Sequence, residues 1–97
     1  VSHYAKLRIM GRGEMEVVVR DVSLTGFSLT DRKKELELTQ GTHGLLRYED
    51  IGHQLEIEGN VVRIEETEEY IIYGFVITKS CRDLSSYVNI KQRQKRT

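Results

Sequence analysis

The stretch that decides the fold is Arg20-Asp21-Val22-Ser23-Leu24-Thr25-Gly26-Phe27-Ser28-Leu29. Apolar and polar residues alternate from Met15 to Val19 and again from Phe27 to Thr30, which predicts two strands. Between these strands stand a carboxylate, a hydroxyl and a glycine. Such side chains bond nearby backbone amides, and glycine permits a positive φ, so the local chemistry fits a self-contained turn and a binding site equally well.

The pattern Asp21-x-Ser23-x-x-Gly26 resembles the signature of PilZ domains, which are bacterial receptor modules for the second messenger cyclic di-GMP. The resemblance extends to Tyr4-Ala5-Lys6-Leu7-Arg8, ahead of a glycine-rich turn, and to Tyr73-Gly74-Phe75 on a late strand. It covers most of the chain. Within the family, the opening segment is most similar to PilZ domains attached to exopolysaccharide polymerisation systems, such as the alginate co-polymerase.

The resemblance implies a cyclic di-GMP site on the outer surface of a barrel, formed by Asp21, Ser23 and Gly26. A carboxylate such as that of Asp21 accepts from guanine N1–H and N2–H₂ together, as a bidentate charge-assisted pair. Ser23 would add a hydroxyl contact, and Gly26 would let the backbone approach the base because it has no Cβ.

The arginines depart from the family pattern. The family's second motif, Arg-x-x-x-Arg, lies just ahead of the first strand and clamps the ligand's phosphates and guanines, and nothing in this sequence fits it. Arg8 and Arg12 share its spacing without its position. The sequence begins where the second arginine would just have ended, so either the motif lies upstream or the domain lacks it. Arg63 resembles a strand arginine that several members place near the ligand, and an ion pair with Glu65 or Glu16 in solvent explains it equally well.

Composition limits the classes of function. With 97 residues, 38% of them apolar, there is room for one domain with a modest core. Lys plus Arg and Asp plus Glu both number 15, so the net charge is zero. This balance argues against a general binder of nucleic-acid polymers or membranes, because their binding depends on summed positive charge. A small anionic ligand needs only a local basic cluster.

The single Cys81 excludes an intramolecular disulfide and a multi-cysteine metal site. No apolar run long enough to span a bilayer and no signal-peptide pattern occur in these residues. We therefore expect a reducing, cytoplasmic setting, either free or as the cytosolic domain of a membrane-attached protein.

Periodicity predicts a mainly all-β fold. Strict alternation places Asp21 at the end of the apolar row of Met15, Val17 and Val19. Between residues 53 and 64 the apolar residues change parity, which predicts a bulge or sharp coil, expected at Gly59-Asn60. Residues 31–35 are expected to form a solvated loop. The predicted strands cover residues 4–10, 15–22, 26–29, 44–48, 53–64 and 70–77.

Two late features complete the predicted fold. Gly74, inside the last strand, indicates a bend or the close approach of another backbone or a ligand. Residues 80–96 are predicted to form a helix capped by Ser80, with Asp83 in its first turn and a basic end that is either a solvated tail or a contact for phosphate or a partner domain. We expect a PilZ-like split antiparallel β-barrel of about six strands over residues 1–79. Residues 80–97 form the C-terminal α-helix and basic tail of the same domain.

Catalysis is not expected. There is no nucleophile with a base and no glycine-rich phosphate loop, and His3, His43 and His53 have neither metal-ligand spacing nor an acidic cluster around them. The predicted function is a regulatory cyclic di-GMP receptor that controls exopolysaccharide synthesis or motility by ligand-dependent docking to a neighbouring domain or partner protein.

The alternative is a degenerate PilZ adaptor that binds proteins and not the nucleotide. The joint presence of Asp21, Ser23 and Gly26 argues against this alternative, because an adaptor needs no guanine acceptor.

Overall fold

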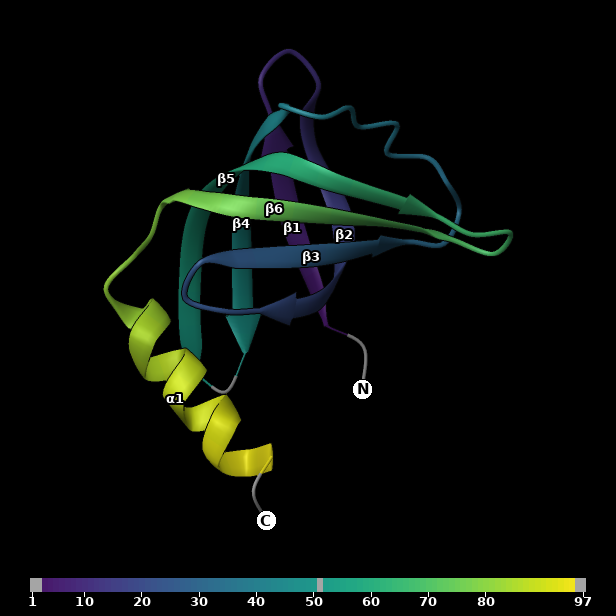
Figure 1. Ribbon diagram of the computed structural model, residues 1–97. Coiled ribbons are helices and arrows are strands. Elements are labelled where there is room, and N and C mark those ends of the chain that lie inside the picture. The colour runs from purple at the N-terminus through teal and green to yellow at the C-terminus, as the bar shows by residue number, and fades with distance from the viewer. Residues whose placement is uncertain (1–2, 51, 96–97) are drawn as a thin grey trace.

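The computed structural model describes residues 3–50 and 52–95, which form six strands followed by one helix (Figure 1). All neighbouring strands pair antiparallel in the order β1-β2-β3-β6-β5-β4, and β1 pairs with β4 to close the barrel. The predicted small antiparallel barrel with a C-terminal helix is confirmed. The elements are β1 (Tyr4–Ile9), β2 (Gly13–Val22), β3 (Gly26–Asp31), β4 (His43–Asp50), β5 (His53–Glu66), β6 (Ile71–Lys79) and α1 (Asp83–Lys95).

The barrel interior is filled by alternate residues of every strand. Along β1 the exposed and buried positions alternate without a break, as a period-2 strand with one face on the core requires. Phe27 and Phe75 stack across β3 and β6 with ring centroids 4.5 Å apart. Each fully buried aliphatic side chain contributes roughly 1.5–3 kcal/mol. The innermost side chains are Leu7, Leu29, Leu46, Leu55, Ile57, Val61 and Tyr73.

The pairing register of the strands shifts at three places, and two of these shifts are β-bulges that interrupt the alternation of outward and inward residues. Pairing between β2 and β3 shifts between Val19 and Asp21, so Asp21 faces outward and the prediction that it ends the inward apolar row is wrong. The predicted change of parity in β5 lies at Val62, between Val61 and Arg63, and a further register shift lies between Glu58 and Gly59, next to the predicted Gly59-Asn60. A change of parity in the apolar residues indicates that a strand contains an extra residue, but it does not identify that residue.

The loop after β3 also differs from its prediction. Asp31 is not solvated: it is the last residue of β3 and 6% exposed. Its carboxylate accepts the backbone N–H groups of Glu35 at 3.2 Å and Leu36 at 3.0 Å. Buried carboxylates require such partners, so Asp31 shapes the loop that leads towards β4.

The helix α1 lies at one end of the barrel, whereas the β5–β6 hairpin projects from the other side (Figure 1). It begins at Asp83, so Ser80 is not its cap, although Asp83 does lie in the first turn as predicted. Leu84, Tyr87 and Val88 are buried with the barrel core, as the helical spacing of apolar residues requires. The predicted last residue, Arg96, lies outside the described residues.

A polar network fastens α1 to the barrel. The Tyr87 hydroxyl donates to Asp50 Oδ2 at 2.8 Å, and its oxygen lies 3.3 Å from the Tyr48 hydroxyl. Lys91 Nζ lies 3.3 Å from the same Asp50 oxygen. The Tyr48 hydroxyl also bonds His3 Nδ1 at 3.0 Å. Burial of Asp50 favours its neutral form, but the bonds from Tyr87 and Lys91 outweigh burial and lower the pKa of Asp50.

Candidate ligand-binding site

Four residues lie in one row across the outer face of neighbouring strands. Asp21 on β2 stands opposite Ser28 on β3, and Ser28 stands opposite Gly74 on β6. Gly74 in turn stands opposite Arg63 on β5. With strands about 4.8 Å apart, the row spans about 14 Å. A carboxylate and a guanidinium thus stand at the two ends of a floor made by a serine and a glycine.

The two bulges create this row. Uninterrupted pairing would place Arg20 opposite Ser28 and Val62 opposite Gly74, whereas the bulges bring Asp21 and Arg63 to those positions. Bulges of this kind re-aim side chains and are common beside functional sites. The outward position of the two charged residues is therefore a property of the fold and not of the alternating pattern.

A depression of about 370 Å³ lies over the row. It contains all four residues that the sequence predicted for the site, which are Asp21, Ser23, Gly26 and Arg63. The β2–β3 turn forms one wall, and β5 and β6 form the floor and the opposite wall. The remaining lining residues are Thr25, Phe27, Ser28, Val62, Gly74 and Phe75.

Ser23 is largely committed to the turn. Its hydroxyl accepts the backbone N–H groups of Thr25 at 3.3 Å and Gly26 at 3.1 Å, and donates to the Gly26 carbonyl at 3.2 Å. Gly26 is required by packing, because a Cβ there would lie 2.5 Å from the Phe75 carbonyl oxygen. The self-contained turn considered from sequence therefore accounts for Ser23 and Gly26.

Asp21 has a different environment. Its side chain is exposed, and within the described residues it takes part in no hydrogen bond or ion pair. Because Ser23 satisfies the turn, the fold has no internal use for the Asp21 carboxylate. Both oxygens of this acceptor are available to a ligand.

Arg63 lies across Gly74. A Cβ built on Gly74 would be 3.3 Å from Arg63 Cβ, 3.4 Å from Nε and 3.8 Å from Nη2. The close approach at Gly74 is therefore made by an arginine side chain, whereas the sequence predicted a bend, another backbone or a ligand there. Arg63 Nε also lies 3.5 Å from Glu65 Oε1, but both side chains are more than half exposed, and such pairs contribute little to stability.

Ser28 was missed by the sequence analysis. It is 4% exposed, and its Oγ has no hydrogen-bond partner in the described part of the chain. A buried hydroxyl without a partner is uncommon and costs stability. The available signal was a polar residue between the apolar Phe27 and Leu29, on the outward side of a strand that adjoins the predicted site.

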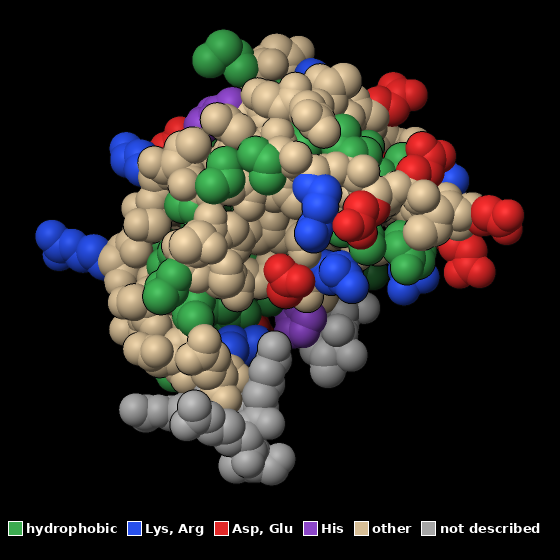
Figure 2. Space-filling view, in the orientation of Figure 1, with side chains coloured by type: hydrophobic (Ala, Val, Ile, Leu, Met, Phe, Trp, Pro, Cys, Tyr) green, Lys and Arg blue, Asp and Glu red, His purple; other side chains and the backbone are tan. Residues whose placement is uncertain are grey.

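The surroundings of the depression are mixed in character. Exposed apolar side chains stand nearby at Leu24, Val62 and Val76. Figure 2 shows acidic and basic side chains interspersed on this side of the molecule, without a large region of one sign, as the zero net charge suggests. A ligand here would meet local charges and not a general electrostatic field.

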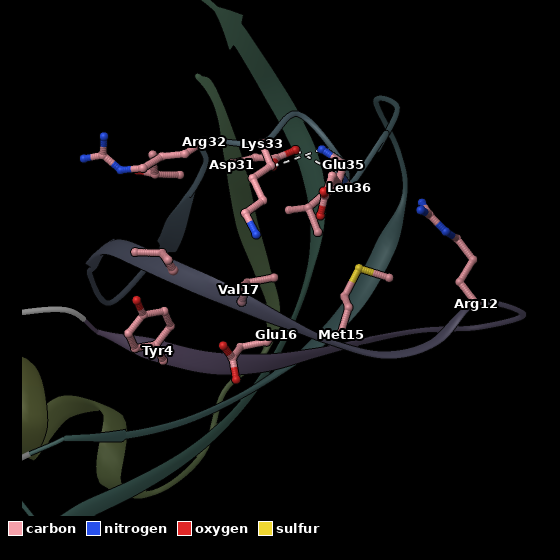
Figure 3. A pocket seen from close by; sticks show the side chains of 12 residues that line it. Tyr4, Arg12, Met15, Glu16, Val17, Asp31, Arg32, Lys33, Glu35 and Leu36 are labelled. Atoms are coloured by element: carbon pink, nitrogen blue, oxygen red, sulfur yellow. Dashed lines mark hydrogen bonds between the residues drawn. The ribbon is translucent and has the colours of Figure 1, made fainter. Parts of the chain in front are cut away.

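A second hollow, of about 650 Å³, lies between β2 and residues 31–36 (Figure 3). Its buried carboxylate, Asp31, is already bonded to backbone amides of the loop, as the dashed lines in Figure 3 show. The rest of its lining mixes apolar side chains such as Met15 with both cations and carboxylates. The smaller depression is the better candidate because it holds an unused carboxylate and an unpartnered hydroxyl.

The fold is a small closed antiparallel β-barrel with a C-terminal helix. A family model described as "PilZ domain" matches residues 4–89, and the chain belongs to the PilZ domain family. PilZ domains are regulatory ligand-binding domains and not enzymes; they form a family of cyclic di-GMP receptors and interact with partner proteins. The predicted family and the prediction that the chain is not an enzyme are confirmed by this match.

A solved structure with the same fold is described as Bacillus subtilis inhibitor of motility (MotI/DgrA). It aligns with a TM-score of 0.79 at 18% sequence identity, over 100% of this chain and 50% of that one. This chain thus spans half the length of that protein, and at this identity the likeness shows the fold alone. No curated protein matches significantly.

Within residues 3–50 and 52–95, no group of three or more His, Cys, Asp or Glu side chains is arranged to hold a metal ion. No helix among these residues is both long and apolar enough to cross a bilayer.

Proposed function

We propose that this chain binds cyclic di-GMP in the depression over the Asp21–Arg63 row. The observation that carries the proposal is the Asp21 carboxylate, which is exposed at the end of the row and has no partner within the described residues. A free carboxylate at this place can accept N1–H and N2–H₂ of a guanine in one bidentate pair.

The other predicted residues have distinct roles in this proposal. Ser23 and Gly26 fix the turn, so that Asp21 is held at the rim and the backbone can approach the base. Arg63 supplies a guanidinium for a phosphate or for the outer face of a guanine. Its exposed contact with Glu65 is easily exchanged for a ligand contact.

As a receptor, the domain would act by ligand-dependent docking to a neighbouring domain or partner protein in the cytoplasm. Binding must favour one arrangement of these parts over another in order to regulate anything. The exposed apolar side chains of Leu24, Val62 and Val76 offer a surface beside the ligand for such contacts. The proposed outputs are exopolysaccharide synthesis, from the resemblance of the opening segment, and motility, which the fold neighbour's name also mentions.

The second candidate is an adaptor that binds proteins and not the nucleotide. The engagement of the Ser23 hydroxyl within its own turn favours this candidate, because a satisfied hydroxyl is less available to a ligand. The unused Asp21 carboxylate favours the receptor. Titration separates the two.

The test is calorimetric titration of cyclic di-GMP into this 97-residue chain and into the same chain extended upstream through the segment that would carry Arg-x-x-x-Arg. Two bidentate arginines are each worth roughly 1.5–3 kcal/mol. If the extension supplies them, we expect it to tighten binding by about two to four orders of magnitude. Equal tight binding by both chains would show that the phosphates bind elsewhere, and no binding by an extended chain that carries the motif would favour the adaptor.

A further inference from the structure

Ser28 lies at the centre of the proposed site, between Asp21 and Gly74 in the outward row. Its hydroxyl is enclosed and has no partner among the described residues, whereas the hydroxyls of Ser23, Tyr73 and Tyr87 are all hydrogen-bonded. A fold normally satisfies such a group or replaces it by an apolar one. An unsatisfied hydroxyl inside a depression is explained if its partner arrives with a ligand.

The position of Ser28 suits a particular part of a guanine. Asp21 would take N1–H and N2–H₂, and the carbonyl O6 is attached to the ring next to N1. Ser28 is one strand removed from Asp21, at a spacing of about 4.8 Å, on the side of the row towards Arg63. A hydroxyl on the strand next to the carboxylate can donate to O6 when the base lies along the row.

Arg63 lies beyond Gly74 in the same row as Ser28. Because Gly74 has no side chain, the guanidinium of Arg63 occupies the space above it, next to Ser28 in the row. The contact that holds Arg63 on the other side, to Glu65, is exposed. Movement of Arg63 towards a ligand phosphate would open the floor of the depression, so that the base reaches the Ser28 hydroxyl.

We infer that Ser28 is a second guanine-reading residue, whose Oγ–H donates to O6 of the base held by Asp21. The inference rests on the proposed function and adds to it a residue outside the Asp-x-Ser-x-x-Gly pattern. It assigns a binding role to a hydroxyl that forms no hydrogen bond within the described residues.

The first experiment compares wild-type protein with Ser28→Ala by calorimetric titration of cyclic di-GMP, using the upstream-extended chain if only that form binds. Loss of one neutral hydrogen bond of about 1 kcal/mol should weaken binding about fivefold. The melting temperature of the free Ser28→Ala protein should equal or exceed that of the wild type, because no internal bond is lost. Ser85→Ala, an exposed serine on α1, is the matched control and should change neither quantity.

The second experiment uses the cyclic dinucleotide of 6-thioguanine, which keeps N1–H and the 2-amino group for Asp21 and replaces O6 by sulfur, a weak hydrogen-bond acceptor. Replacement of O6 should weaken binding by a larger factor in the wild type than in Ser28→Ala, because only the wild type has a hydroxyl that donates to O6. Equal loss in both proteins, an unchanged affinity of Ser28→Ala for cyclic di-GMP, or a lowered melting temperature of Ser28→Ala would each overturn the inference. Tight binding by the wild type in those cases would leave the proposed function intact, whereas failure of the wild type to bind would refute the function itself.

Discussion

Asp21 and Asp50 lie at or near the ends of their strands, yet the fold treats the two carboxylates differently. Asp50 receives hydrogen bonds from Tyr87 and Lys91 and lies 4.0 Å from His3 Nδ1. Asp21 is exposed, and the described residues provide it with no partner. One carboxylate fastens the helix to the barrel, and the other is held at the rim of a depression without an internal function. Environment, and not residue type, separates a structural aspartate from a candidate ligand-binding one.

The largest expected effect is on affinity, in Asp21→Ala. Loss of a bidentate charge-assisted pair, roughly 1.5–3 kcal/mol per bond, should weaken binding of cyclic di-GMP by about two to four orders of magnitude. The free energy of unfolding should change by less than about 0.5 kcal/mol, because an exposed side chain without partners is removed. Titration calorimetry and urea denaturation of the same sample measure both quantities. A clearly destabilised variant would contradict the contrast drawn between the two carboxylates.

The second prediction concerns Asp50→Ala, which should lower the stability of the fold and leave the affinity for the nucleotide unchanged. This change leaves the buried Tyr87 hydroxyl with one partner fewer and Lys91 without its carboxylate. We expect a loss of about 2–3 kcal/mol in the free energy of unfolding, measured by urea denaturation, with Asp21→Ala as the matched control. Affinity for the nucleotide should stay within about twofold under conditions where the variant is folded. An Asp50→Ala protein as stable as wild type would mean that the network does not fasten α1.

These two aspartates also show how much of the fold and of the candidate site could be predicted from the sequence. The six strands, the barrel, the β2–β3 turn and the family follow from alternation and the Asp21-x-Ser23-x-x-Gly26 pattern. Alternation alone placed Asp21 on the inward face, because a strict period of two takes no account of the bulge at Arg20. The sequence thus named a residue that lies at the rim of the depression, but it placed that residue on the wrong face of the strand.

The missing parts of the site depend on pairing between distant strands. Ser28 lies in one row with Gly74 and Arg63 only because β3 pairs with β6 and β6 pairs with β5. No local sequence pattern specifies that register. The same applies to Asp31 and Asp50, whose partners depend on the path of a loop and on the docking of a helix. Local chemistry predicts which side chains can bind a ligand, whereas tertiary pairing decides which of them are already in use.

The smallest expected effect concerns a third carboxylate, Glu58, whose partner titrates near neutral pH. His43 Nε2 lies 3.0 Å from Glu58 Oε1, and Nδ1 lies 2.7 Å from Asn60 Oδ1. The bond to Glu58, followed by that to Asn60, raises the pKa of His43 above its ordinary value. With a raised folded pKa, this stabilisation is fully present below the unfolded pKa of about 6.5 and is lost as pH rises through the folded value. Because both side chains are partly exposed, the effect should be small.

Thermal unfolding followed between pH 5 and pH 9 (roughly the range that brackets an imidazole pKa) should therefore show a slight fall in stability with rising pH. His43→Gln is the matched control, because its neutral amide can still bond Glu58 or Asn60 but does not titrate, so its slope through this window should be flatter. The three carboxylates thus differ in their partners. Asp50 is bonded to the buried Tyr87 and to Lys91, and Glu58 is bonded to a surface imidazole whose charge depends on pH. Asp21 has no partner among the described residues. If the stability of wild type and of His43→Gln changed equally with pH, the His43–Glu58 bond would not stabilise the fold. An exposed position alone would then be enough to deprive a carboxylate of a structural role.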